Sequence, residues 1–228
     1  MAKNHLKRIT APKTWPISRK SSVFITKPRP GPHPAAQAVT LNILCKEMLG
    51  FARTLRGVKF ILTTKEVLVN GRRRRKPGDV AGLFDVVTFP EAKSSYRITI
   101  TQQGKLGAIP VAGKEASLVP CRIRSKRLLR GGKLQLGFHN GIMRIVEKGE
   151  YGVGDTVLLT LAGEETAHFP LRKGSFVIIT SGQHVGVTGV LAGLADGRVT
   201  VESPAGKVET VKEHVFVIGE KKPAIKVA

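Results

Sequence analysis

The sequence is poor in cysteine, in aromatic residues and in acidic residues. Cys45 and Cys121 are the only two cysteines among 228 residues, and they lie far apart in the chain. This pair fits no zinc motif and suggests no disulfide framework, so we expect a protein of the reducing cytoplasm. Aromatic residues make up 5% of the chain, which also has 25 glycines and 13 prolines. That balance favours short strands joined by many turns.

The usual signatures of membrane attachment and of catalysis are also missing. No apolar run approaches the roughly 18 residues of a membrane span, and no apolar stretch follows the basic N-terminus as in a secretory signal. There is no Gly-x-Ser-x-Gly elbow, no Gly-x-x-x-x-Gly-Lys-Ser/Thr phosphate loop and no histidine pair at metal-ligand spacing. We therefore expect no membrane partner, no metal, no cofactor and no small-molecule substrate.

Positive charge is what the sequence has in excess. There are 38 Lys and Arg residues against 16 Asp and Glu residues, which gives a formal net charge of +22. Such an excess repels itself in a compact monomer and is neutralised when a polyanion is bound. Because the chain has no amphipathic basic helix and no lipidation motif, nucleic acid is favoured over an anionic membrane.

The N-terminal 36 residues predict an extended arm. They carry eight Lys or Arg residues and no acid, and six prolines interrupt any helix or central strand. Trp15, Phe24 and Ile25 are large apolar groups that a purely disordered tail tends to lack. We expect the arm to order as it binds RNA, with Trp15 packing or stacking. Its candidate RNA-binding residues are Lys3, His5, Lys7, Arg8, Lys13 and Trp15.

Two helices are predicted over residues 39–62. In the first, apolar residues from Leu41 to Leu49 recur at helical spacing, and Gly50 is placed to end the helix. In the second, Thr54 can cap a helix that buries its own apolar stripe. The second helix would expose three candidate RNA-binding residues, which are Arg53, Arg56 and Lys59.

A basic loop is predicted between two strands after the second helix. Glu66–Val69 reads as a strand, and Asn70-Gly71 supplies the turn because both residues tolerate positive φ. The chain returns as a strand over Leu83–Phe89. Five cations between these strands have no stabilising role in a monomer and indicate nucleic-acid binding. They are Arg72, Arg73, Arg74, Arg75 and Lys76.

The rest of the chain predicts two units of short strands. Residues 95–170 have the spacing of a small barrel or meander, with a basic loop or turn over residues 125–133. Five short strands over residues 171–219 predict an SH3-like barrel, in which His184 is a turn residue or an RNA contact. Weaker RNA-binding candidates in the first of these units are Arg122, Arg124, Lys126, Arg127, Arg130 and Lys133.

Several stretches resemble known RNA-binding modules. Gly182–Val190 resembles the KOW motif of ribosomal and transcription-elongation proteins, and Leu41–Gly78 resembles the alpha-L RNA-binding fold. Their order along the chain resembles that of the archaeal and eukaryotic small-subunit ribosomal proteins of the S4e type. Further matches to that family are Lys3-Asn4-His5-Leu6-Lys7-Arg8, Gly31-Pro32-His33, Phe84-Asp85-Val86-Val87, Tyr96-Arg97 and Phe216-Val217-Ile218-Gly219.

The resemblance covers essentially the whole chain and implies an α+β protein with four folded or rRNA-contacting parts. These are an arm over residues 1–36, an alpha-L domain over 37–94, a central β domain over 95–170 and a KOW barrel over 171–219, followed by a basic tail over 220–228. The short C-terminus favours an archaeal source. The implied function is that of a structural constituent of the small subunit, in contact with its rRNA and with neighbouring ribosomal proteins. We expect no enzyme and no homo-oligomer.

Two other functions fit part of the pattern. Pseudouridine synthases also carry alpha-L domains, but the nearest match to their catalytic motif, Gly82-Leu83-Phe84-Asp85, lacks the arginine. A KOW-bearing transcription or elongation factor would usually have a globular N-terminal domain built around a sheet. The basic arm and the alpha-L unit argue against that second alternative.

Overall fold

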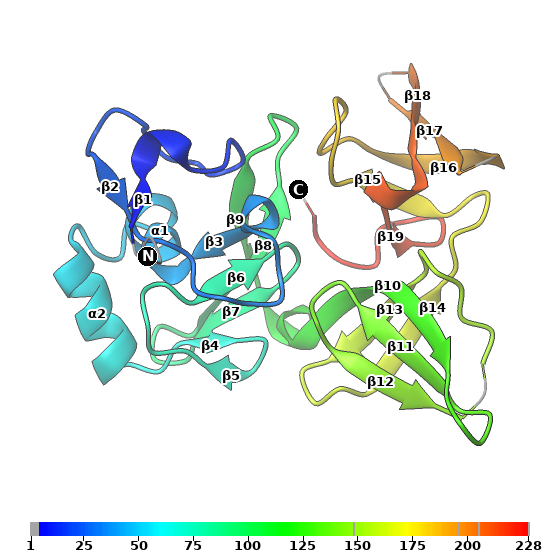
Figure 1. Cartoon of the computed structure of the whole chain (residues 1–228), viewed down its shortest axis with the longest axis horizontal. Coiled ribbons are helices and arrows are strands. Elements are labelled where there is room, and N and C mark those ends of the chain that lie inside the picture. The colour runs from blue at the N-terminus through cyan, green and yellow to red at the C-terminus, as the bar shows by residue number, and fades with distance from the viewer. Residues whose placement is uncertain (1–4, 148, 196, 205, 228) are drawn as a thin grey trace. The chain divides into compact units, whose positions relative to one another are not determined.

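The computed structural model describes residues 5–147, 149–195, 197–204 and 206–227. The chain divides into two compact units, one of residues up to Ser117 and one over Leu118–Val227. In the described ranges, strands pair only with strands of their own unit, and helices are few (Figure 1). The fold therefore contains both helices and strands, with strands in the majority, which agrees with the expected α+β class.

The first unit is built on one antiparallel sheet of five strands in the order β5-β4-β7-β8-β9. A second, two-stranded sheet pairs β3 with β6. The strands of these sheets are β3 (Ala38–Thr40), β4 (Leu68–Val69), β5 (Arg72–Arg73), β6 (Val80–Gly82), β7 (Val86–Phe89), β8 (Ser94–Ile100) and β9 (Leu106–Val111). The sheet runs through residues 94 and 95, where we had expected a domain boundary, because β8 pairs with β7 on one side and β9 on the other.

The two predicted helices form where the sequence places them. The first consists of α1 (Leu41–Ile43) and one π-helical turn, η3 (Leu44–Met48), and Gly50 follows at φ 68°. The second, α2 (Leu55–Thr64), begins where the Thr54 hydroxyl accepts a hydrogen bond from the Gly57 amide. The first helix buries Leu41, Leu44 and Cys45, and the second buries Val58 and Leu62 but leaves Leu55 43% exposed. A short 3-10 turn, η4 (Gly113–Ser117), ends the unit.

The N-terminal arm is packed onto the first unit, which differs from the extended arm that we expected. β1 (Leu6–Lys7) and β2 (Phe24–Ile25) pair as a two-stranded ribbon. The 3-10 turn η1 (Arg8–Thr10) follows β1, and a second one, η2 (Ala35–Gln37), directly precedes β3. Trp15 is 1% exposed, and its indole Nε1 donates to the carbonyl oxygens of Ala35 and Ala38. Prolines exclude helix and central strand here, but they do not prevent burial of a large side chain.

The second unit contains two five-stranded antiparallel sheets. The first has the order β12-β11-β10-β13-β14. Its strands are β10 (Leu118–Leu128), β11 (Leu134–Phe138), β12 (Met143–Val146), β13 (Thr156–Thr160) and β14 (Glu165–Phe169). The predicted basic loop over residues 125–133 is too long, because residues 125–128 pair with β11. Only residues 129–133 form the turn, where Gly131 and Gly132 have φ of 84° and 74°.

The second sheet of this unit has the order β18-β17-β16-β15-β19. Its strands are β15 (Phe176–Ile179), β16 (Thr188–Ala195), β17 (Arg198–Ser203), β18 (Gly206–Val211) and β19 (Val215–Gly219), with the 3-10 turn η5 (Lys212–His214) before the last. All five strands lie within residues 171–219, where the sequence predicted five short strands. Apolar residues at alternate positions of these strands pack together in one buried core, which includes Val177, Leu191, Val199, Val201, Val215 and Val217.

Candidate nucleic-acid interface

The densest group of exposed cations lies on and after the β4–β5 hairpin. Asn70 and Gly71 reverse the chain at φ of 49° and 74°, as predicted from their tolerance of positive φ. Arg72 and Arg73 then form β5 at the edge of the sheet, so the basic run is part strand and part loop rather than a loop alone. Four side chains of the run are exposed, Arg72, Arg73, Arg75 and Lys76, whereas Arg74 is half-buried.

A buried polar network holds the base of this hairpin. The Asn70 side chain donates to Asp85 Oδ1 at 2.7 Å and accepts from the Val86 amide at 2.9 Å. Asp85 Oδ2 also accepts from the Gly82 amide at 2.7 Å and lies 3.1 Å from His33 Nε2. His33 can approach this closely because residue 82 is a glycine, and a Cβ there would clash with the imidazole ring. The network fixes where the hairpin leaves the sheet.

The environment of Asp85 favours its charged form. Burial by itself raises the pKa of this carboxyl, but the hydrogen bond and charge of His33, with the Gly82 and Asn70 donors, outweigh it and lower the pKa below its ordinary value. The side chain is 4% exposed. Asp85 is thus a buried structural carboxylate, and it does not lie where a substrate base could reach it.

Cations on α2 and before it supply a second exposed group in the first unit. Arg53, Arg56 and Lys59 are all exposed, as predicted. Arg56 and Lys59 are three residues apart on the helix, so they lie on the same side of it. Val58 and Leu62 are buried, which turns the basic side of the helix to solvent.

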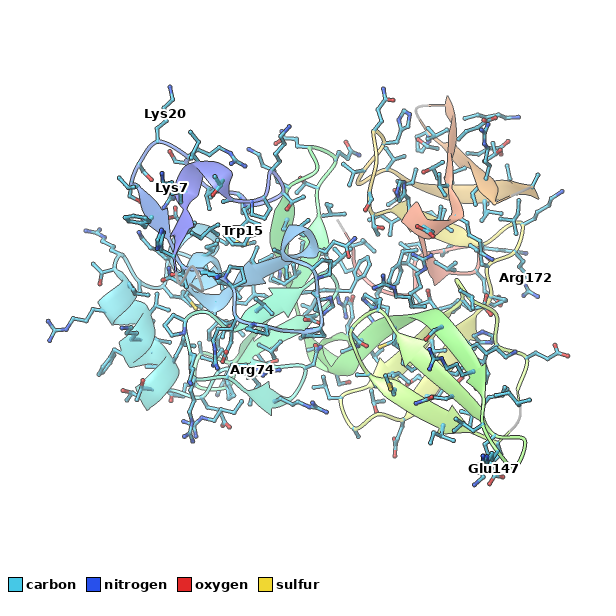
Figure 2. The ribbon with its side chains drawn as sticks, viewed as in Figure 1. Lys7, Trp15, Lys20, Arg74, Glu147 and Arg172 are labelled. Atoms are coloured by element: carbon cyan, nitrogen blue, oxygen red, sulfur yellow. The ribbon has the colours of Figure 1, made fainter. Side chains whose placement is uncertain are left out.

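The predicted residues of the arm divide into exposed and buried ones. His5, Lys7 and Lys13 are exposed, and Lys3 lies outside the described residues. Arg8 is 3% exposed, and its guanidinium binds Glu47 at 2.7 Å and also donates to Ser18 and Ser22. Figure 2 shows Lys7 on the arm and Trp15 within the unit. The structure argues against Arg8 and Trp15 as RNA contacts, because their side-chain nitrogens are hydrogen-bonded within the protein.

Lys20 and Phe24 are among the exposed arm residues that the sequence did not single out as RNA contacts. Lys20 points away from the arm (Figure 2), and Phe24 is 56% exposed. Lys20 was one more cation in a basic segment, and nothing in its sequence context separated it from Arg19. Arg19 instead donates to the carbonyl oxygens of Ile9, Ala11 and Pro12. Phe24 is apolar, as Trp15 is, and only the fold shows that Phe24 remains exposed while Trp15 does not.

The cations of the second unit follow β10 and the turn after it. Arg124, Lys126, Arg127, Arg130 and Lys133 are exposed. Two of them have partners within the protein, since Lys126 donates to the Tyr151 carbonyl and Lys133 lies 3.7 Å from Glu147. His184 is exposed in the turn between β15 and β16.

Arg122 differs from the other cations of β10. It is half-buried, and its guanidinium donates to the carbonyl oxygens of Glu213 and Lys212. Burial lowers the pKa of this guanidinium, with the nearby Glu213 charge opposing that shift. The side chain therefore ties β10 to η5, a structural role that the sequence did not indicate.

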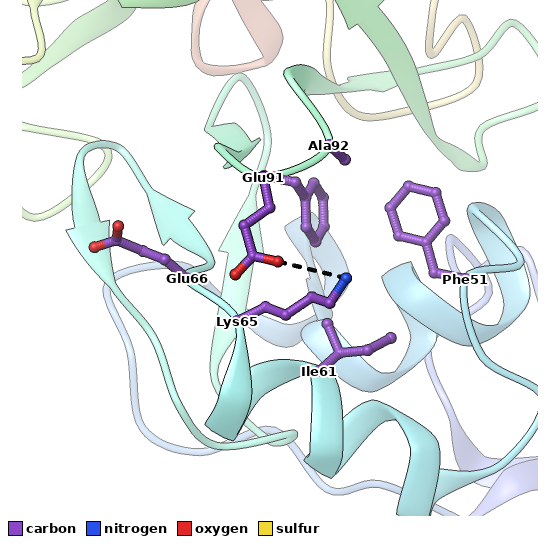
Figure 3. Close-up of a pocket in the computed structure, with 7 residues that line it drawn as sticks. Phe51, Ile61, Lys65, Glu66, Glu91 and Ala92 are labelled. Carbon is purple, nitrogen blue, oxygen red and sulfur yellow. Dashed lines mark ion pairs between the residues drawn. The ribbon is translucent and has the colours of Figure 1, made fainter.

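A small apolar pocket lies between α2 and the end of β7. Its volume is about 250 Å³, and Phe51, Ile61 and Phe89 line it, while Lys65 and Glu91 pair at 3.4 Å beside it (Figure 3). Glu66 and Ala92 complete the lining. Among the described residues, no three His, Cys, Asp or Glu side chains could hold a metal ion together, and no helix could cross a membrane.

Comparisons with known proteins agree on one family. The model described as "RS4NT (NUC023) domain" matches residues 2–36, and the model described as "Ribosomal family S4e" matches residues 92–166. Small ribosomal subunit protein eS4 of Methanocella arvoryzae is 36% identical over 232 residues, which cover 99% of this chain and 98% of that protein. The protein of the same name from Archaeoglobus fulgidus is 37% identical over 235 residues, with 99% and 98% covered.

A solved structure is similar as well. The crystal structure of the 30S ribosomal protein S4e from Thermoplasma acidophilum matches with a TM-score of 0.71 and 28% sequence identity. The match covers 84% of this chain and 99% of that one. The likeness to these relatives therefore extends over nearly the full length of the sequence and over most of the fold.

Proposed function

Because this chain belongs to ribosomal family S4e, we propose that it is a structural constituent of the small ribosomal subunit, which binds and stabilises folded small-subunit rRNA. The observation that carries the binding role is the exposed basic run after the Asn70-Gly71 turn. Within the described residues, Arg72, Arg73, Arg75 and Lys76 form no ion pair with an acidic side chain. Phosphate oxygens can bind all four of these cations, and they can bind the three arginine guanidinium groups through two parallel hydrogen bonds.

Binding would act mainly through phosphate and shape. Side chains cannot read the deep, narrow major groove of an A-form helix, so contacts to phosphates and 2′-hydroxyls dominate. Each phosphate that a cation neutralises releases counterions, so affinity falls steeply with salt. The exposed cations of α2 and of β10 would add to those of the basic run.

The finer assignments are parts of the same proposal. They are an rRNA-contacting arm over residues 1–36, an alpha-L domain that begins at residue 37, a central β domain that ends at residue 170, an SH3-like KOW barrel over 171–219 and a basic tail over 220–228. The sheet that β8 continues and the division of the chain after Ser117 favour a boundary between the alpha-L and central domains near residue 118 rather than residue 95. We place the protein on cytoplasmic ribosomes beside other small-subunit proteins, as a single copy without enzymatic activity. The burial of Asp85 supports the last point, because a pseudouridine synthase needs its catalytic aspartate open to the flipped base.

Neutralising the exposed part of the basic run tests the binding role. We expect Arg72→Gln, Arg73→Gln and Arg75→Gln together to lower affinity for small-subunit rRNA. The slope of log affinity against log salt should flatten by up to about 0.9 for each phosphate that the variant no longer neutralises. Filter binding of the full chain to transcribed small-subunit rRNA across a salt series measures both quantities.

A matched triple variant controls for the loss of charge alone. Lys65, Arg172 and Lys207 are also exposed, but each is paired with an acid, at 3.4, 3.3 and 3.3 Å. Changing these three to Gln should alter the salt slope much less. Equal effects of the two triples, or no effect of the first, would contradict the assignment of the basic run. Failure of the native protein to co-sediment with small subunits would contradict the ribosomal role itself.

A further inference from the structure

The ribbon of β1 and β2 brings a cation and two aromatic rings to one face. Lys7 is the direct cross-strand partner of Phe24, so their side chains lie on the same face of the ribbon. His5 precedes Lys7 by two residues, and its ring centroid lies 5.3 Å from that of Phe24 at an interplanar angle of 78°. Leu6 and Ile25 pair on the opposite face and are half-buried.

This face is open to solvent. Phe24 is 56% exposed, and His5 and Lys7 are exposed as well. Trp15 of the same segment is 1% exposed. The arm therefore buries one of its large aromatic side chains and leaves another exposed, although folding favours burying both.

The ribbon is held in place by bonds that do not involve its exposed face. The Arg8 amide donates to the Val23 carbonyl at 2.8 Å, and the Arg8 guanidinium donates to Ser22 and binds Glu47. Because Arg8 is buried, these contacts fix the strand that carries Phe24 before any partner arrives. A platform fixed in advance loses little conformational entropy when a ligand stacks on it.

Charge decides which kind of partner fits the face. Lys7 and Lys20 are exposed, and residues 1–36 contain no aspartate or glutamate. A basic partner is repelled by such a surface, whereas a nucleotide offers a flat ring for Phe24 and a phosphate for a neighbouring cation. Aromatic side chains beside cations are the common means of binding unpaired bases.

We propose that Phe24 is a stacking platform for one unpaired base of the bound RNA, with the Lys7 ammonium group at the adjoining phosphate and His5 supporting the Phe24 ring. This inference rests on the proposed function, because it names the RNA feature that the arm would recognise. It assigns to Phe24 the stacking role that the sequence suggested for Trp15.

The test compares single strands with and without bases. The probes are an adenosine dodecamer and a ribose-phosphate chain of the same length that lacks bases, bound to the full chain. Phe24→Ala should weaken binding of the dodecamer roughly tenfold and leave the base-free chain unaffected. Phe24→Tyr, which keeps a ring, should restore binding of the dodecamer. Lys7→Gln should weaken both probes and flatten the salt dependence of both.

Leu161→Ala is the control for the loss of an exposed apolar side chain, because Leu161 is 39% exposed and lies in the turn between β13 and β14, close in sequence to Glu164 and Glu165 and outside the proposed RNA contacts. It should leave the affinities for both probes unchanged. The inference is overturned if Phe24→Ala weakens both probes equally or neither. It is also overturned if Phe24→Ala reduces only incorporation into reconstituted small subunits, since the face then contacts a protein. Binding of small-subunit rRNA by the wild-type chain separates these results from failure of the proposed function.

Discussion

At the scale of single residues, burial separates side chains that the sequence could not separate. Arg8 and Lys7 are neighbouring cations, yet Arg8 is 3% exposed and paired with Glu47 while Lys7 is exposed. Arg122 and Arg124 differ in the same way on β10. A cation whose donors are already bound within the protein has little left for a phosphate. The exposed members of each pair are therefore the better candidates for RNA contacts.

Asp85 gives a prediction about acid stability. Its lowered pKa means that folding stabilises the charged carboxylate, so this contribution is present above the unfolded pKa of about 4 and is lost as pH falls through the lower folded pKa. We expect Asp85→Asn to lower the free energy of unfolding by about 3 kcal/mol at pH 6. Urea denaturation of variant and wild type from pH 6 to pH 3 should show this difference shrinking in acid.

Asp79→Asn is the control for that series. Asp79 pairs with Arg29 at 3.3 Å, and the Arg29 side chain is 49% exposed, so the pair is screened by water. The expected loss is below about 1 kcal/mol. A difference between Asp85→Asn and wild type that stays constant down to pH 3 would contradict the role given to the Asp85 charge.

At the scale of secondary-structure elements, the close approach of neighbouring strands explains why one position of the KOW-like segment Gly182–Val190 is a glycine. Gly189 lies in β16 opposite β17, and a Cβ there would clash with the Glu202 carbonyl oxygen and would lie 2.8 Å from Val201 Cγ1. The glycine is thus needed for packing between strands. No left-handed conformation is involved at this position.

Gly189→Ala should therefore destabilise the second sheet of the second unit. We expect a loss of about 2 kcal/mol, because the backbone of β17 cannot move aside as a flexible side chain could. Gly193→Ala is the matched control on the same strand, since its nearest neighbour would be Thr200 Oγ1 at 3.9 Å. Chemical denaturation of the two variants measures the difference, and equal losses would show that strand propensity, not the close approach, is the cause.

At the scale of the whole molecule, net charge acts on folding and on RNA binding in opposite directions. A charge of +22 destabilises the compact chain through self-repulsion, which dissolved salt screens. The same salt weakens binding to phosphates. The isolated protein is thus expected to be most stable under the conditions in which it binds RNA least.

Thermal unfolding checks the first half of that statement. Raising potassium chloride from about 0.05 to 0.5 M should raise Tm by roughly 5 °C, which corresponds to one or two kcal/mol for a chain of this size. The variant Arg72→Gln, Arg73→Gln and Arg75→Gln should respond less, because it carries less charge to screen. A Tm that falls with salt, or the same response in both proteins, would contradict this account.

Much of the fold could be predicted from local sequence. The Thr54 cap, the Asn70-Gly71 turn and all five strands of the last sheet lie close to where turn chemistry and alternation place them. The strands β9 and β14 and the ribbon of β1 and β2 were missed. β9 contains Gly107 and Pro110, two residues that are rare in strands. β14 has the sequence Glu-Thr-Ala-His-Phe, which lacks a regular alternation of apolar and polar residues. Such strands are specified by the neighbours they pair with.

The sequence by itself determined the class of partner, because net charge is a sum over residues that no fold can change. It also determined the turns and the helix ends, since these depend on residues within a few positions of one another. The tertiary structure alone decided which side chains meet that partner. Trp15 and Arg8 are buried, and Phe24 and Lys7 are exposed, through contacts with residues as distant as Ala38 and Glu47. Contacts of that range leave no periodic signal in the sequence.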